Sequence, residues 1–311
     1  MLSLAFPSFP DSSTIGIRPP GYRLPPSAHV GRVRLAVSSL ERSVEFYRDV
    51  IGLCVLNSGG QEVGLVKLGP RSSTHVLLEL EEIQGVRPVG RRTRLGLYHT
   101  AFLLSSREVL SSFVRHLVET GTYFGAADHT VSEALYLIDP NGLSVEVYAD
   151  RPRTQWAYEG REIVSGVKPV RLDELSSVTQ ARWEGVPADT TVGHVHFYVG
   201  ELAAAAKFYH AALGLDIATW RYPGVLFVSA GGYHHHVGFN VWAAGSPPAS
   251  QEDARLLTWE LVLPSYEEVV RVVASLRTNG FSTAQAESRA NTFSDPWGIT
   301  VALVTRVDHN E

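Results

Sequence analysis

The chain has 311 residues, of which 44% are hydrophobic and 19% are charged, and its formal net charge at pH 7 is -5. This length and composition predict folded domains with substantial cores rather than extensive disorder. The acidic balance and the lack of a dense lysine or arginine run give no reason to expect binding to nucleic acid or to an anionic membrane surface. We therefore expect a small-molecule partner.

Cys54 is the only cysteine, so an internal disulfide is excluded and any metal site must use nitrogen and oxygen ligands. The N-terminal residues lack a basic segment followed by a long apolar core. No later apolar run approaches the roughly 20 residues that a membrane-spanning helix needs. These features predict a cytoplasmic protein.

The first elements follow a proline- and serine-rich segment, residues 1–28, which we expect to be a loosely attached arm. Alternating residues from Val30 predict a half-buried strand, and apolar residues at helical spacing between Val44 and Val50 predict a helix that ends at a glycine. Short β-like runs follow at 64–69 and 74–82. The order is therefore β-α-β-β-β.

The same pattern occurs three more times along the chain. Residues 192–215 align with residues 30–53 without a gap and keep the Val-Gly, Phe-Tyr and Gly-Leu pairs. Weaker copies begin at Leu97 and Leu257, each with a strand, a helix and a later turn containing Asp-Pro and Gly. The sequence thus predicts an α+β protein of four βαβββ modules. We expect modules one and two in residues 29–150, a linker at 151–190, and modules three and four in residues 191–305.

One segment of the second module carries the most specific motif. Residues 129–146, HTVSEALYLIDPNGLSVE, fit the pattern H-x5-L-Y-x2-D-P-x-G-x3-E. This pattern resembles the signature of extradiol ring-cleaving dioxygenases, which open catechol rings with Fe(II) and dioxygen. Ala127 departs from it, because the signature has Gly, Asn, Thr or a β-branched residue there.

The four modules resemble the vicinal oxygen chelate superfamily over nearly all of residues 29–305. This superfamily includes glyoxalase I, fosfomycin-resistance proteins and extradiol dioxygenases, and its curved mixed sheets enclose one metal ion. The chain is most similar to the Bacillus-type bacterial catechol 2,3-dioxygenases. The segments that carry this resemblance are GLYHTAFLL, SEALYLIDPNG, EVYADRPR and SAGGYHHHVGFN.

The resemblance implies that each module can offer one ligand from its first strand and one from its last. The first-strand positions hold Arg32, His99, His194 and Thr258, and the last-strand positions hold Glu79, Glu146, Asn240 and Ala302. Pairing modules two and three unites His99, Glu146 and His194, a 2-His-1-carboxylate set suited to Fe(II), with Mn(II) as an alternative. Sequential pairing would instead unite His99, Glu146 and Glu79. We predict the crossed pairing.

The resemblance also implies that His129 lies near the substrate and that Tyr136 donates a hydrogen bond to a bound oxygen. If the third module's last strand included its histidine triplet, alternation would turn His234, His236 and Asn240 inward and His235 outward. We therefore predict His236 as the acid-base catalyst and His234 and Asn240 as substrate-binding residues. His196 shares a strand face with His194 and is also predicted to contact the substrate.

The predicted function is cleavage of catechol or a substituted catechol by a homo-oligomeric Fe(II) dioxygenase. A glyoxalase-like isomerase or lyase and a metal-free binding protein of the same fold are the alternatives, since a fold alone does not define an activity. Arg151 and Arg153 are expected to form surface ion pairs or to bind an acidic substituent at the pocket. Trp220, Tyr222 and Trp242 are candidates for an aromatic wall or for core positions.

Overall fold

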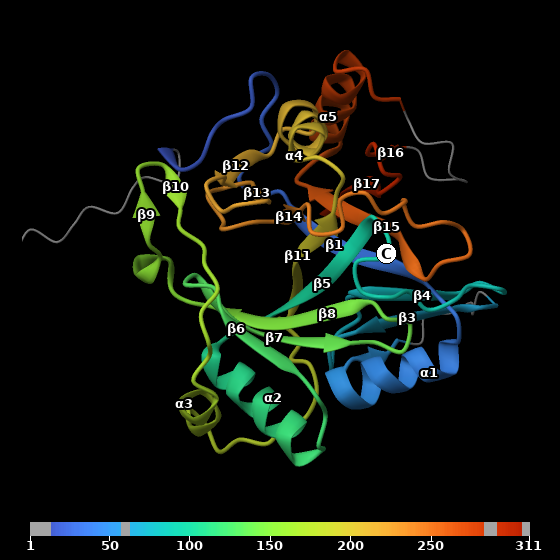
Figure 1. Cartoon of the computed structure of the whole chain (residues 1–311), viewed down its shortest axis with the longest axis vertical. Coiled ribbons are helices and arrows are strands. Elements are labelled where there is room, and N and C mark those ends of the chain that lie inside the picture. Colours follow the sequence, from blue (N-terminus) through green and yellow to red (C-terminus); the bar gives the residue numbers. More distant parts are fainter. Residues whose placement is uncertain (1–13, 57–62, 283–290, 307–311) are drawn as a thin grey trace, which may run out of the picture.

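The computed structural model describes residues 14–56, 63–282 and 291–306. These residues form two curled mixed sheets with helices on their outer sides, which confirms the α+β prediction (Figure 1). In the view of Figure 1, α4 (Leu202–Ala205) and α5 (Tyr266–Thr278) lie above the sheets. Helices α1 (Leu40–Glu45), α2 (Arg107–Glu119) and α3 (Leu172–Ser177) lie below them.

The eight-stranded sheet combines the second and third modules in the order β12-β13-β14-β11-β5-β8-β7-β6. Its second-module strands are β5 (Gly96–Leu104), β6 (Gly125–Asp128), β7 (Ser132–Ile138) and β8 (Ser144–Asp150). Its third-module strands are β11 (Thr191–Tyr198), β12 (Asp216–Thr219), β13 (Val225–Ser229) and β14 (Val237–Asn240). Antiparallel pairing of β5 with β11 joins the two modules, so the predicted crossed pairing is confirmed.

The seven-stranded sheet combines the first and fourth modules in the order β16-β17-β15-β1-β4-β3-β2. Its first-module strands are β1 (His29–Val37), β2 (Cys54–Val55), β3 (Leu65–Gly69) and β4 (Leu78–Glu82). Its fourth-module strands are β15 (Arg255–Leu263), β16 (Thr292–Ser294) and β17 (Thr300–Thr305). Antiparallel pairing of β1 with β15 joins them, so the chain ends are brought into one sheet.

Local signals explain where the module helices begin and end. Ser39, Ser106 and Ser265 cap three of them, each side chain accepting a hydrogen bond from a backbone N–H in the first turn. The helices of the first and third modules continue as wider π-helical turns, η2 (Phe46–Ile51) and η4 (Ala206–Ala212). Gly52 follows the first of these in a left-handed conformation with φ 89°, as a glycine C-cap permits.

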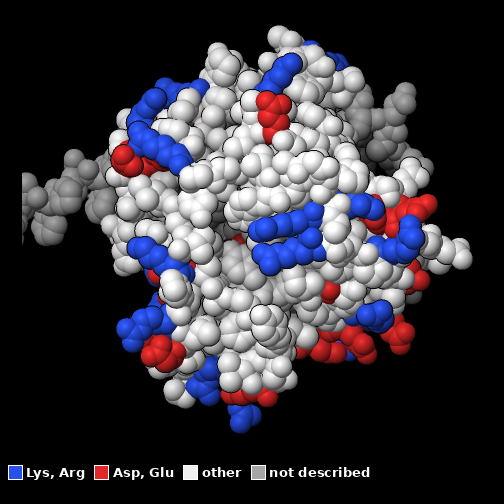
Figure 2. Space-filling model, viewed as in Figure 1, with Lys and Arg blue, Asp and Glu red and all other residues white. Residues whose placement is uncertain are grey.

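The surface over the eight-stranded sheet is hollowed. Figure 2 shows this hollow near the middle of the face, over the region where Figure 1 places β5 and β11.

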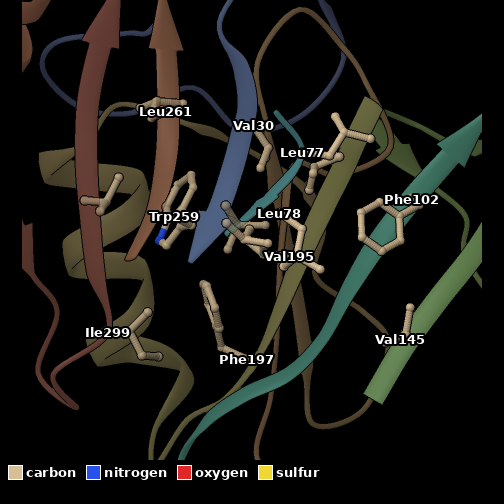
Figure 3. Close-up of a cluster of buried hydrophobic side chains, with 14 of the residues drawn as sticks. Val30, Leu77, Leu78, Phe102, Val145, Val195, Phe197, Trp259, Leu261 and Ile299 are labelled. Carbon is tan, nitrogen blue, oxygen red and sulfur yellow. The ribbon is translucent and has the colours of Figure 1, made fainter. Parts of the chain in front are cut away.

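A continuous apolar core lies between the two sheets. In Figure 3, Val30 on β1 and Trp259 and Leu261 on β15 face the space that Phe102 on β5 and Val195 on β11 approach from the other sheet. All five side chains are buried in one hydrophobic cluster. Burial of such side chains stabilises each by about 1.5–3 kcal/mol, so this packing holds the two sheets in a fixed relation.

The prediction of a loosely attached arm is wrong for residues 14–28, and residues 1–13 lie outside the described residues. Ile15 is buried with Trp156 and Ile163 in a small second cluster, and Leu24 joins the main core. Ion pairing between Arg23 and Asp216 adds a further tie at 2.7 Å. Proline and serine content indicated mobility, but the apolar residues between them supply the attachment.

The segment between the module pairs, expected to be a linker, also carries structure. It contains a short turn, η3 (Arg153–Gln155), the hairpin β9 (Tyr158–Glu159) and β10 (Glu162–Ile163), and α3. None of the helices in the described residues is long and apolar enough to cross a membrane.

Candidate metal centre

Strand register brings three side chains of the eight-stranded sheet to one point. Ala101, at the centre of β5, lies opposite Glu146 of β8 on one side and opposite His194 of β11 on the other. His99 precedes Ala101 by two residues and therefore projects from the same face. Because the alanine side chain is small, the three longer side chains can converge above it.

The three groups have the spacing of ligands that share one ion. His99 Nε2 lies 3.0 Å and His194 Nε2 lies 3.3 Å from Glu146 Oε2, and the two Nε2 atoms are 3.3 Å apart. Donors that bind one ion at about 2.1 Å are separated by about 3 Å when their bonds are roughly perpendicular. All three side chains are buried, and together they form a His-Glu-His metal-binding triad.

The electrostatics of the triad also suit a bound cation. Burial would raise the pKa of Glu146, but His194 and His99 outweigh this effect and hold it well below its ordinary value. Burial lowers the pKa of His99 and of His194, although Glu146 opposes this. A carboxylate beside two neutral imidazoles leaves one negative charge in a buried site, where an unpaired charge is costly.

Neighbouring rings orient the two histidines. The Tyr98 ring centroid is 4.5 Å from that of His99, and the His235 centroid is 4.1 Å from that of His194. In the described part of the chain neither Nδ1 atom has a hydrogen-bond partner. Ring packing therefore keeps both Nε2 atoms directed at Glu146.

The triad opens into a cavity of about 270 Å³, near the lower end of the range for small-molecule sites. Three predicted residues, His129, Tyr136 and His196, line it. Tyr222 and Trp242 line it as well, whereas Trp220 does not appear among its wall residues. The remaining wall residues are Arg91, Arg92, Tyr98, Ala127, Ser132, Ser165, Gly166, Val167, Val225, Phe227 and His235.

Tyr136 and His129 form a hydrogen-bonded pair at the wall. His129 Nδ1 lies 2.9 Å from the Gly166 carbonyl oxygen, which only accepts, so Nδ1 carries the proton. With Nδ1 as the donor, Nε2 accepts from the Tyr136 hydroxyl at 2.6 Å. Tyr136 lies opposite Glu146 in the β7–β8 ladder, and burial, followed by the charge of Glu146, raises its pKa well above the usual value.

The predicted orientation of the histidine triplet is wrong. Gly231 and Gly232 both have positive φ, and β14 begins only at Val237, so strand alternation does not extend through the triplet. His235 is the member that lines the cavity. Two adjacent glycines before the triplet are the sequence signal for this turn.

His236 and His234 make contacts outside the cavity wall. His236 Nδ1 accepts the Ala230 backbone N–H at 3.1 Å, and burial, followed by the effect of His29, lowers the pKa of His236 to about 3. His234 Nε2 lies 2.8 Å from Asp150 Oδ1. The predicted acid-base role of His236 and substrate contact of His234 therefore have no geometric support.

Asn240 does not line the cavity either. Its Nδ2 donates to His196 Nε2 at 3.0 Å, and its Oδ1 accepts the Trp242 backbone N–H at 3.0 Å. It therefore lies behind His196 and fixes the orientation of that ring. The predicted direct substrate contact of Asn240 therefore has no geometric support, whereas His196 lines the cavity.

Other sequence alternatives are resolved by position. Glu79 lies on β4 of the other sheet, where its Oε1 is 3.5 Å from Arg32 Nη1, so it does not join the triad. Arg151 forms an ion pair with Asp128 at 2.8 Å, as expected for a surface pair. Arg153 packs its guanidinium over Trp156, and neither arginine lines the cavity.

Comparisons with known proteins agree with this architecture. The model of the Glyoxalase/Bleomycin resistance protein/Dioxygenase superfamily matches residues 29–147 and 191–303. Catechol-2,3-dioxygenase of Bacillus subtilis (strain 168) is 40% identical over 284 residues, which cover 90% of this chain and 97% of that relative.

Two solved structures share the fold. A putative dioxygenase from Bacillus subtilis is 12% identical with a TM-score of 0.61, over 92% of this chain and 86% of that one. Glyoxalase I from Zea mays is 16% identical with a TM-score of 0.54, over 91% of this chain and 94% of that one. With two matched stretches, a homologue of this identity and the buried triad, the chain belongs to the glyoxalase/bleomycin resistance protein/dioxygenase superfamily.

Proposed function

We propose that this protein is an extradiol dioxygenase that cleaves catechol or a substituted catechol with dioxygen at a mononuclear non-haem Fe(II) site. The observation that carries the proposal is the convergence of His99, Glu146 and His194 at the base of a cavity. Its specificity comes from similarity to the catechol-2,3-dioxygenase of Bacillus subtilis, which is 40% identical over 284 residues.

The triad is suited to hold Fe(II) and leave positions open for other ligands. When bound, the iron would supply coordination positions for catechol and dioxygen and the redox chemistry between them. The negative charge of Glu146 would partly offset the charge of a bound divalent ion. The two histidines would occupy coordination positions without changing the net charge of the site. Mn(II) accepts the same donors, so availability also decides which ion is held.

The remaining cavity residues would bind substrate and handle protons. The Tyr136 hydroxyl donates to His129, so its oxygen can accept a hydrogen bond from a substrate hydroxyl, while the Gly166 carbonyl keeps the proton of His129 on Nδ1. His196, held by Asn240, would contact the substrate ring. Phe227 and Trp242 provide apolar surface that excludes water from it.

Anaerobic reconstitution tests the proposal directly. The full chain is loaded with Fe(II) under argon, iron per chain is measured, and catechol is added in air. A yellow ring-opened product formed with one dioxygen consumed per catechol is the expected result. Stoichiometric iron without product or oxygen uptake would contradict the proposal, and turnover of a hemithioacetal with Zn(II) or Ni(II) would favour a glyoxalase-like activity instead.

Two further expectations from the sequence belong to the same proposal. We expect a cytoplasmic enzyme, because an Fe(II) site benefits from a reducing compartment. We also expect a homo-oligomer, as is usual for symmetric assembly of soluble enzymes. Sedimentation of the purified chain measures the second directly.

A further inference from the structure

Two arginines at the cavity wall are not used by the proposed reaction. Arg91 and Arg92 line the cavity, and both side chains are exposed. Figure 2 shows basic side chains beside the hollow on this face. Glu146 is the one carboxylate among the described residues that line the cavity, and it belongs to the triad.

These two arginines differ in their ion pairing from the other arginines of the same loop. Arg87 pairs with Glu252, and Arg94 pairs with Asp253 at 2.8 Å. In contrast, no acidic side chain of the described chain lies within salt-bridge distance of Arg91 or Arg92. The cavity entrance therefore carries two positive charges that no carboxylate of the described residues neutralises.

Two contacts and an uncommon backbone angle position Arg92 in this loop. Arg92 has a φ of 60°, which is uncommon for a residue other than glycine. The Ser246 hydroxyl donates to the Arg92 carbonyl at 3.0 Å, and the Arg92 guanidinium lies 5.6 Å from the centre of the Trp242 ring. The positive charge of Arg92 thus lies against the aromatic wall of the cavity.

Tyr98 separates the arginines from the triad. Its ring centroid lies 4.5 Å from His99 and 5.7 Å from Trp242, on which Arg92 packs. An anion bound to these arginines would therefore lie beyond the ring that binds at the triad. A second cavity of about 450 Å³ shares Arg91, Arg92 and Tyr98 with the first, which gives room for a substituent.

We propose that Arg91 and Arg92 bind the carboxylate of a catechol that bears a short acidic side chain, an inference that rests on the proposed dioxygenase function. Guanidinium groups bind carboxylates through paired, charge-assisted hydrogen bonds. The substrate class is therefore an aromatic acid with two adjacent hydroxyls and a carboxylate a few bonds from the ring. The arginines determine specificity and take no part in ring opening.

Dihydrocaffeate and its methyl ester test this assignment with the iron-loaded full chain. The ratio of kcat/KM for the acid to that for the ester should exceed one, and it should fall at least about tenfold in the Arg91→Gln/Arg92→Gln variant. The ratio should also fall as ionic strength rises. In the Arg91→Glu/Arg92→Glu variant, dopamine should become the preferred substrate over dihydrocaffeate.

Arg87→Gln is the matched control, because Arg87 lies in the same loop but pairs with Glu252 outside the cavity. It should keep the wild-type acid-to-ester ratio, and dissociation constants measured without oxygen should show the same preferences. If catechol is cleaved but the acid is not preferred, the inference fails and the dioxygenase stands. If no catechol is cleaved while acid binding still depends on Arg91 and Arg92, the proposed reaction fails and the anion site stands.

Discussion

The two sheets share one architecture but place different nitrogen-bearing side chains at corresponding positions. Arg32 of β1 aligns with His194 of β11 in the gapless repeat. Its Nε donates to Glu260 at 2.6 Å and its Nη1 lies 3.5 Å from Glu79. A guanidinium carries a permanent positive charge and has no lone pair for a metal. In this sheet the arginine side chain itself therefore supplies the positive charge beside the carboxylates.

The cross-strand partner of the corresponding carboxylate also differs between the two sheets. Lys67 lies opposite Glu79 in the β3–β4 ladder, whereas Tyr136 lies opposite Glu146 in the β7–β8 ladder. The seven-stranded sheet therefore balances its carboxylates with basic side chains, and the eight-stranded sheet supplies neutral donors. A structural ion pair and a metal site can therefore occupy equivalent places in a duplicated fold.

Among the changes that test this difference between the sheets, Glu146→Gln should have the largest effect, on metal binding. Loss of the charged ligand should weaken metal binding by more than about a hundredfold, since even residues behind metal ligands contribute about 10- to 100-fold. Iron per chain after anaerobic loading measures the change. Glu79→Gln is the control in the other sheet and should retain the iron, and equal loss in both variants would contradict the assignment.

Arg32→Met tests the opposite side of the comparison. It leaves Glu79 and Glu260 buried without their cation, so the free energy of unfolding should fall by about 3–5 kcal/mol. Urea unfolding of the metal-free chain measures this loss. The further changes Glu79→Gln and Glu260→Gln should recover part of it, because they remove the carboxylate charges that Arg32 no longer offsets. An unchanged midpoint for Arg32→Met would show that the pair contributes nothing to the fold.

Tyr136→Phe separates proton handling from metal binding. The ring remains, but the hydroxyl that donates to His129 is lost, so kcat/KM for catechol should fall about a hundredfold while iron content stays at the wild-type level. Tyr148→Phe is the matched control, because that hydroxyl bonds to Tyr233 and does not line the cavity. Equal losses in the two variants would argue against a role for Tyr136.

The smallest expected effect concerns two equivalent turns, one in each sheet. Burial raises the pKa of Asp139 and of Asp295 to about 6, despite their hydrogen bonds to neighbouring groups. Since an unfolded aspartate has a pKa of about 3.9, this contribution to stability is present below pH about 4 and is lost as the pH rises through about 6.

Asp139→Asn should therefore remove about 2 kcal/mol of that pH dependence, and Asp295→Asn should do the same. Urea unfolding between pH 4 and 7 gives the free-energy difference between each variant and the wild type. A difference that stays flat over this range would contradict the raised pKa.

The repeats predicted the module order, and the resemblance to the superfamily indicated the strand positions at which residue types then predicted the three triad residues. His99, Glu146 and His194 could be found because each occupies a repeated strand position and only one pairing of modules unites them. The same residue types favoured pairing of modules two and three, although pairing of modules in sequential order was the alternative. Burial of Ile15 and Leu24 was not predicted, because single apolar residues among prolines give no periodic signal.

The cavity wall was harder to predict than the triad. His235 reaches it through a turn with two positive-φ glycines, a conformation that alternation does not describe. Gly166 and Val167 reach it from the segment between the module pairs. The position of that segment depends on packing against residues that are distant in the sequence. Arg91 and Arg92 lie in a loop without a recognised motif, so only the folded cavity reveals them.

The pairing of β5 with β11 has a consequence for how the protein is made. When residues up to 190 have been translated, the nascent chain contains His99 and Glu146 but not His194, so it lacks one ligand of the triad. Tight ion capture must therefore await the third module. The seven-stranded sheet closes later still, because β15 and β17 are translated last. Cofactor loading thus belongs to the second half of biosynthesis rather than to its first half.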